Sequence, residues 1–92
     1  MSDMLSNVRV SPFCYVCEFE GESILLDEKA GKFYRLNKVA AFVFRLIENN
    51  IQVCELSARV AEEFSVSQDE CSPDITELLA NFQDAGIILV GR

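Results

Sequence analysis

Apolar residues follow two different spacings along this chain, one strand-like up to residue 36 and one helical from residue 39 onward. Three early runs, residues 13–19, 23–27 and 32–36, are rich in the β-branched, aromatic and alternating apolar residues typical of strands. Turns are expected between them at residues 20–22 and 27–31, where Gly31 suits a positive φ. The pattern predicts a three-stranded antiparallel meander.

Helical spacing begins directly after Asn37, which is a good N-cap for a first helix. That helix should end at Asn49 and Asn50, because asparagine tolerates the left-handed conformation that terminates helices. A second helix follows, and Ser72 as N-cap with Pro73 at the first helical position predicts the start of a third. The three apolar stripes are Val39, Phe42, Val43, Leu46 and Ile47; Val53, Leu56, Val60, Ala61 and Phe64; and Ile75, Leu78, Leu79 and Phe82.

The segments around the third helix complete the predicted layout. Residues 65–69 are expected to form a polar link before it, and Ala85 and Gly86 to close it ahead of a short apolar tail, residues 87–90. Three strands followed by three helices predict an α+β fold in which the sheet packs on a small helical bundle, like a winged helix-turn-helix. The third strand, or the first, would lie at an open edge of the sheet.

Length and composition indicate a single domain. The chain has 92 residues, of which 50% are hydrophobic and 25% charged, so we expect one domain over residues 1–92 with a flexible N-terminus at about residues 1–8. No run approaches the roughly 18–20 apolar residues that span a bilayer, and the N-terminus lacks the features of a signal peptide. The expectation is a cytoplasmic protein with no membrane partner.

The net charge of −7 is unevenly distributed. Residues 1–59 carry seven Lys or Arg against eight Asp or Glu, whereas residues 60–91 carry none against seven. The predicted third helix contains Asp74, Glu77 and Asp84 and would repel the phosphates of DNA. A nucleic-acid partner is therefore not expected, although a winged-helix transcriptional regulator remains the main alternative function.

Catalytic and metal-binding motifs are weak. Cys14 and Cys17 have the CxxC spacing, with Cys54 and Cys71 as further possible ligands, but residues three apart in a strand point to opposite faces. We expect the cysteines to act as small apolar residues, with no metal and no cofactor. The chain has no His, phosphate loop or nucleophile elbow, so it is not expected to be an enzyme.

An extended peptide is a better candidate partner, because an open strand edge can accept a further strand. Tyr34 and Leu36 should face the helices, and with part of the third helix's stripe they would form an apolar groove, although at least half of that stripe should be ordinary core. Four cations border the strand and would attract an acidic peptide, or would simply protect the edge from aggregation. These cations are Lys29, Lys32, Arg35 and Lys38.

The other face of the sheet is a second candidate surface. Phe33 is expected to lie there with Val16, Leu25 and Cys14, which makes that face unusually apolar. We hypothesise that it docks a companion enzyme or a second copy of the chain. The oligomeric state, monomer or dimer, is left open.

Several segments together resemble the PqqD family. They are LLDEKAGKFYRLN, VCELSARVAEEF and SPDITELLANFQDAGII, so that the resemblance covers about residues 23 to 88. Its most specific parts are Leu26 and Asp27 with Gly31, the pair Leu36 and Asn37, and Asp74 with Leu78, Leu79 and the closing residues 85–87. Asn49 and Asn50 depart from the usual turn sequence, and Gln52 stands where Ser or Thr would cap the second helix, weakening the cap by on the order of 1 kcal/mol.

The resemblance implies a RiPP recognition element, a small non-catalytic domain that binds the leader of a ribosomally made precursor peptide. In that family the leader is added as a fourth strand to strand three, against helix three. The implied partners are the leader and a companion, either a radical-SAM enzyme or, as in lasso-peptide clusters, a leader peptidase. Carried over by position, the implied peptide-binding residues are Lys32, Phe33, Tyr34, Arg35, Leu36, Asp74, Ile75, Leu78, Leu79 and Phe82.

Overall fold

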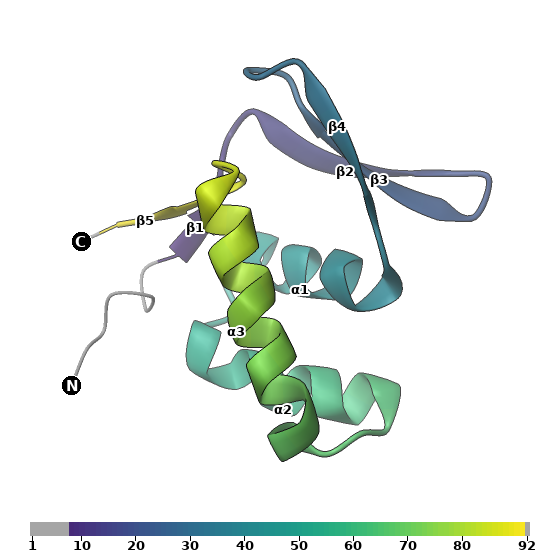
Figure 1. The fold of residues 1–92 in the computed structure, drawn as a ribbon, viewed down its shortest axis with the longest axis vertical. Helices are drawn as coiled ribbons and strands as arrows, with labels where there is room; N and C mark the ends of the chain where they lie inside the picture. Colours follow the sequence, from purple (N-terminus) through teal and green to yellow (C-terminus); the bar gives the residue numbers. More distant parts are fainter. Residues whose placement is uncertain (1–7, 92) are drawn as a thin grey trace.

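A meander, a three-helix unit and a small two-stranded sheet make up the chain (Figure 1). The computed structural model describes residues 8–91. In chain order the elements are β1 (Val8–Val10), β2 (Cys14–Phe19), β3 (Glu22–Asp27), β4 (Lys32–Leu36), α1 (Lys38–Glu48), α2 (Val53–Phe64), α3 (Gln68–Asp84) and β5 (Ile88–Val90). The predicted α+β arrangement of a three-stranded antiparallel sheet followed by three helices is confirmed.

The meander has the strand order β2-β3-β4, so β4 is an edge strand. The first hairpin turns at Glu20 and Gly21, whose φ angles are both positive (52° and 80°), the conformation that matches the twist of a two-residue hairpin. The second turn contains Gly31 at φ 68°, and the Asp27 carboxylate accepts hydrogen bonds from the Lys29 and Ala30 N–H groups (3.1 Å each). Both turns lie where the sequence predicted them.

The strand register corrects the predicted composition of the outer sheet face. Val16 pairs with Leu25, and Leu25 pairs with Tyr34, and directly opposed residues share a face. Leu25 is fully buried and Val16 packs on the core. The prediction that Cys14, Val16 and Leu25 lie with Phe33 is therefore wrong.

The outer face consists of other residues. Phe33 is paired with Leu26, which is paired in turn with Tyr15. A shift of one position in the assumed pairing moves every side chain of a strand to the opposite face. The register follows from where the two turns close, which hydrophobic spacing within a single strand does not determine.

Helices α1 and α2 begin as the sequence predicted. The Asn37 side chain accepts a hydrogen bond from the Ala40 N–H (2.7 Å), and α1 ends at Asn49, next to Asn50 at φ 65°. Gln52 precedes α2 and makes no side-chain cap hydrogen bond, in agreement with the expected weak cap.

Helix α3 begins earlier than predicted, so Ser72 is not its N-cap and residues 65–69 are not all linker. The N-cap is Ser67, which forms a capping box with Glu70. This reciprocal pair satisfies two backbone N–H groups at once, and α3 continues through Pro73. The capping box at Ser67, five residues before Ser72, is a stronger helix-start signal than the pair of Ser72 and Pro73. The predicted end holds, with Ala85 as C-cap and Gly86 at φ 77°.

The apolar tail is a strand. β5 pairs antiparallel with β1, with Val10 opposite Ile88 and Val8 opposite Val90. Val8 therefore belongs to a strand and not to the flexible N-terminus predicted at about residues 1–8, whose remaining residues, 1–7, lie outside the described part of the chain. The sequence pattern does not predict β1, because a strand of three residues has almost no periodicity.

One core joins the sheet to the helices. Phe44 of α1 is fully buried and meets Phe82 of α3 edge to face, with ring centroids 6.3 Å apart, a favoured aromatic geometry. Leu25 of β3 and Ile88 of β5 belong to the same cluster. Within residues 8–91, no helix is long and apolar enough to cross a bilayer.

Candidate functional site

The edge strand β4 has the two faces that its alternation predicted. Tyr34 and Leu36 are half-buried and pack against the core. Phe33, with 70% of its side chain exposed, points the other way, as does Arg35. Because β4 is the last strand of its sheet, one side of its backbone lacks a partner strand within that sheet and is available to an added one.

On α3, most of the predicted peptide-binding side chains belong to the core. Ile75, Leu79 and Phe82 are buried, which agrees with the expectation that at least half the stripe is ordinary core. Leu78 is half-buried and Asp74 is exposed. Of the five residues on α3, these two are the ones whose side chains a peptide would reach directly.

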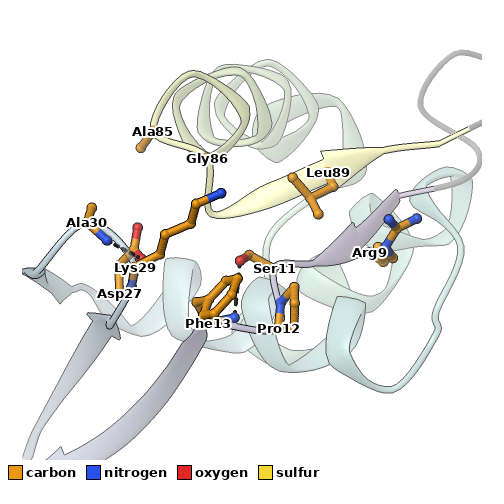
Figure 2. A pocket seen from close by; sticks show the side chains of 10 residues that line it. All are labelled: Arg9, Ser11, Pro12, Phe13, Asp27, Lys29, Ala30, Ala85, Gly86 and Leu89. Carbon is orange, nitrogen blue, oxygen red and sulfur yellow. Dashed lines mark hydrogen bonds between the residues drawn. The ribbon is translucent and has the colours of Figure 1, made fainter.

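Two hollows lie in the region of α3. One, of about 280 Å³, includes Val39 of α1 together with Asp74 and Ile75 of α3. The other, of about 620 Å³, includes the turn that precedes β4 and the residues that follow α3 (Figure 2). In Figure 1 the strand β4 and the helix α3 run in opposite directions, with the start of β4 toward the same end of the molecule as the last turn of α3.

The cations around β4 are not equivalent. The Nε of Arg35 is 3.3 Å from Oε1 of Glu22, so its charge is partly compensated. The ammonium of Lys29 lies 5.7 Å from the centre of the Phe13 ring. Lys32 and Lys38 are exposed and form no ion pair within the described residues. The uncompensated positive charge therefore lies at the two ends of β4.

The cysteines do not converge. Cys14 is buried toward the core and Cys17 is exposed, on opposite faces of the sheet as strand alternation predicted. Burial is the main reason that the pKa of the Cys14 thiol is raised. Cys54 is exposed and Cys71 buried, and no group of three or more His, Cys, Asp or Glu in residues 8–91 is placed to hold a metal ion.

The larger hollow also includes residues from the N-terminal part of the chain that the sequence did not indicate. Arg9 and Phe13 line it together with Leu89. They meet only because β1 pairs with β5, and no local signal in the sequence indicates that pairing.

Comparisons with known proteins agree with this architecture. The family model of coenzyme PQQ synthesis protein D (PqqD) matches residues 22–88, and the chain belongs to this family. The fold also matches two solved structures, whereas no curated protein sequence gives a significant match.

Both solved structures are similar in fold and distant in sequence. A lasso peptide synthetase B1 complexed with the leader peptide has a TM-score of 0.78 and 22% identity, covering 90% of this chain and 98% of its own. TbiB1 in complex with the TbiA(beta) leader peptide has a TM-score of 0.77 and 19% identity, covering 87% and 93%. The resemblance noted from the sequence is confirmed at the level of family and fold.

Proposed function

We propose that this chain is a non-catalytic adaptor that binds the leader of a ribosomally made precursor peptide and presents it to a modifying enzyme. Membership of the PqqD family supports the proposal, as does the likeness in fold to two proteins solved with leader peptides. The observation that carries it is the edge strand β4, whose apolar side chains pack against the core and whose outer backbone edge pairs with no other strand in residues 8–91.

In this proposal the leader adds a strand along β4. Its backbone would pair with residues of Lys32–Leu36, as in other strand-addition complexes. Tyr34, Leu36 and Leu78 would contact its apolar side chains, and Asp74 would contact its polar ones. Ile75, Leu79 and Phe82 would act from beneath the peptide, because their side chains are buried in the core. Phe33 and Arg35 would contribute through their backbone.

The test is a titration of a fluorescein-labelled leader, taken from the short reading frame beside the gene and followed by anisotropy. Tyr34→Ala and Leu78→Asp should each weaken binding about tenfold or more, because each removes an apolar contact at the centre of the surface. The matched controls are Phe33→Ala, on the opposite face of β4, and Ala80→Asp, at an exposed position of α3. Equal affinity for the leader in wild type, folded Tyr34→Ala and folded Leu78→Asp would refute the placement of the groove.

The lysines at the ends of β4 would accelerate encounter with an acidic leader. Lys32→Glu should mainly lower the association rate constant and flatten its dependence on salt, because long-range attraction acts before the contacts form. Stopped-flow anisotropy at several ionic strengths measures both. If the association rate constant of Lys32→Glu depends on salt as in wild type, Lys32 does not attract the leader, and its role is to protect the edge strand from aggregation.

The companion would be a separate protein, either a leader peptidase as in lasso-peptide pathways or a radical-SAM enzyme. We further propose that it docks on the outer sheet face, which exposes Tyr15, Phe19 and Phe33 and adjoins the strand that would hold the leader. Sedimentation of the chain alone, and mixed with the neighbouring enzyme, distinguishes monomer, dimer and complex. If Phe33→Asp and wild type sediment alike in both samples, the outer face is not the docking surface.

A transcriptional regulator is the less supported alternative. Helix α3 carries acidic residues in its first turn, Asp69 and Glu70, and no basic residue along its length, so it would repel a DNA backbone. Duplex binding with a steep salt dependence would favour the regulator, and one bound metal per chain would favour a metal or redox carrier. The winged-helix likeness, the single domain over residues 1–92 and the cytoplasmic location stay predictions.

A further inference from the structure

The larger hollow lies between the turn that connects β3 to β4, the end of α3 and the β1–β5 pair (Figure 2). Ala30 and Ala85 stand at one end of it, next to β4 and α3, and Arg9 stands at the other. Phe13 and Leu89 supply apolar surface between these ends. Its volume of about 620 Å³ is enough for one or two side chains of a peptide.

The polar framework of this hollow is internally satisfied. Ser11 is buried; its backbone N–H donates to the Ile87 carbonyl (2.8 Å), and its hydroxyl oxygen accepts from the Phe13 N–H (3.2 Å). The buried Asp27 carboxylate accepts from the two N–H groups of the β3–β4 turn. These hydrogen bonds fix the walls of the hollow. The polar groups on its lining that stay available to a ligand are therefore the cations.

Two cations line the hollow, and neither has a carboxylate partner within the described residues. Lys29 extends across the opening beside Phe13, and Arg9 is exposed on β1. One carboxylate, Asp27, faces them from below, and its charge is partly compensated by the two N–H groups that it binds. The combination of apolar walls and two exposed cations fits an acidic side chain next to an apolar one.

The hollow continues the surface along β4. Lys29 and Ala30 lie in the turn before the strand, separated from Lys32 by Gly31, so a peptide paired with β4 that extends two or three residues past Lys32, at about 3.3 Å per residue, would enter it. The hollow of about 280 Å³, by contrast, is lined by Glu70 and Asp74. An acidic residue of the peptide would thus be favoured in the larger hollow and disfavoured in the smaller one.

We propose that this hollow is a second subsite for the same peptide, which takes an acidic residue and a neighbouring apolar side chain just beyond the segment paired with β4. This inference rests on the proposed leader-binding function. An acidic residue held in this hollow would fix which way the leader lies on the adaptor, and hence from which end its remainder emerges.

The test combines a change in the protein with a change in the peptide. The double variant Arg9→Gln/Lys29→Gln removes both cations, and Arg45→Gln/Arg59→Gln, on α1 and α2, changes the net charge equally away from the hollow. Each is titrated with the labelled leader and with a leader whose Asp and Glu residues outside the β4-paired segment are replaced by Asn and Gln. Hydrogen exchange on the complex identifies the paired segment.

The first variant should bind the natural leader about tenfold more weakly than wild type, and the control variant within about twofold. For the charge-neutral leader, the wild type and Arg9→Gln/Lys29→Gln should differ by less than twofold, because the group that the cations recognise is gone. Ala85→Leu, which narrows the hollow without changing charge, should also weaken binding of the natural leader.

The possible failures are distinguishable. Absence of leader binding by the wild type overturns the proposed function and this inference together. Binding that depends on Tyr34 but is equal in wild type and Arg9→Gln/Lys29→Gln overturns the subsite alone. Equal losses in the two double variants would show that only net charge matters, which also overturns it.

Discussion

Asp27 illustrates how one side chain shapes the strand next to it. It is buried, yet its carboxylate is satisfied by the Lys29 and Ala30 N–H groups, an arrangement in which aspartate mimics a backbone turn. The sequence predicts a turn at residues 27–31, but not the orientation of this carboxylate. Because the turn positions the start of β4 and one wall of the larger hollow, Asp27 links local geometry to the proposed site.

Glu18 leads to a prediction about pH at the same scale. Its Oε2 accepts hydrogen bonds from the Ser23 hydroxyl (2.7 Å) and from Arg45, and these contacts, Ser23 first, lower the pKa of Glu18 below the ordinary 4.5. A carboxylate whose pKa is depressed by folding stabilises the protein above its unfolded pKa, and this contribution is lost as pH falls through the folded value. Glu18→Gln should therefore be less stable than wild type near neutral pH and nearly equal to it at about pH 3.

Urea denaturation at the two pH values measures this difference. The control is Glu20→Gln, an exposed glutamate two residues away with the same change of charge. A gap between wild type and Glu18→Gln that stays constant with pH would mean that Glu18 contributes through packing and not through its charge.

At the scale of elements, α3 shows two start signals in competition. The Ser67–Glu70 capping box begins the helix, and Pro73 is consequently an interior residue that supplies no N–H to the helix. In this position proline disfavours the helix, whereas at the first helical position it would be favourable. Because α3 begins at Gln68, its first two turns contribute Glu70, Asp74 and Ile75 to the lining of the hollow of about 280 Å³.

Pro73→Ala distinguishes the two helix starts by the sign of its effect. With α3 beginning at Gln68, the substitution restores a backbone hydrogen bond and should raise the free energy of unfolding by about 1–3 kcal/mol. Pro12→Ala, in an exposed loop, should be neutral or slightly destabilising, because it only increases the conformational entropy of the unfolded chain. Thermal and urea unfolding measure the stability of both variants. A Pro73→Ala variant less stable than wild type would indicate that the helix starts at Ser72 instead.

At the scale of the whole molecule, the β1–β5 pair connects the two ends of the described chain and closes one side of the core. Ile88 is almost fully buried in the main cluster, whereas Leu89 on the adjacent position is half-buried and lines the larger hollow. The segment that hydrophobic spacing described as a tail is thus part of both the core and the proposed subsite.

Ile88→Ala should lower the free energy of unfolding by about 2–5 kcal/mol, the usual cost of truncating a buried isoleucine. Leu89→Ala should cost less than half as much, because its side chain is partly exposed, and should act mainly on leader binding. Denaturant unfolding and the anisotropy titration separate the two effects. Similar, small losses of stability for both variants would mean that β5 does not close the core.

The sequence alone determined the features that depend on local spacing and turn chemistry. The meander, the ends of α1, the opposed faces of Cys14 and Cys17 and the inward orientation of Tyr34 and Leu36 all follow from side-chain alternation, helix caps and glycine turns. The resemblance to the PqqD family also rested on short segments in a fixed order. Such features involve residues a few positions apart, whose relative geometry the backbone conformation already defines.

The tertiary structure decided what depends on segments far apart in the chain. It set the register that turns Val16 and Leu25 toward the core and exposes Phe33, the pairing of β1 with β5, and the division of the α3 stripe between core and surface. It also brought Arg9, Phe13 and Lys29 around one hollow. These outcomes depend on the free energy of closing the turns and burying one face of each element against another, and that free energy is a property of the assembled core and not of any single segment.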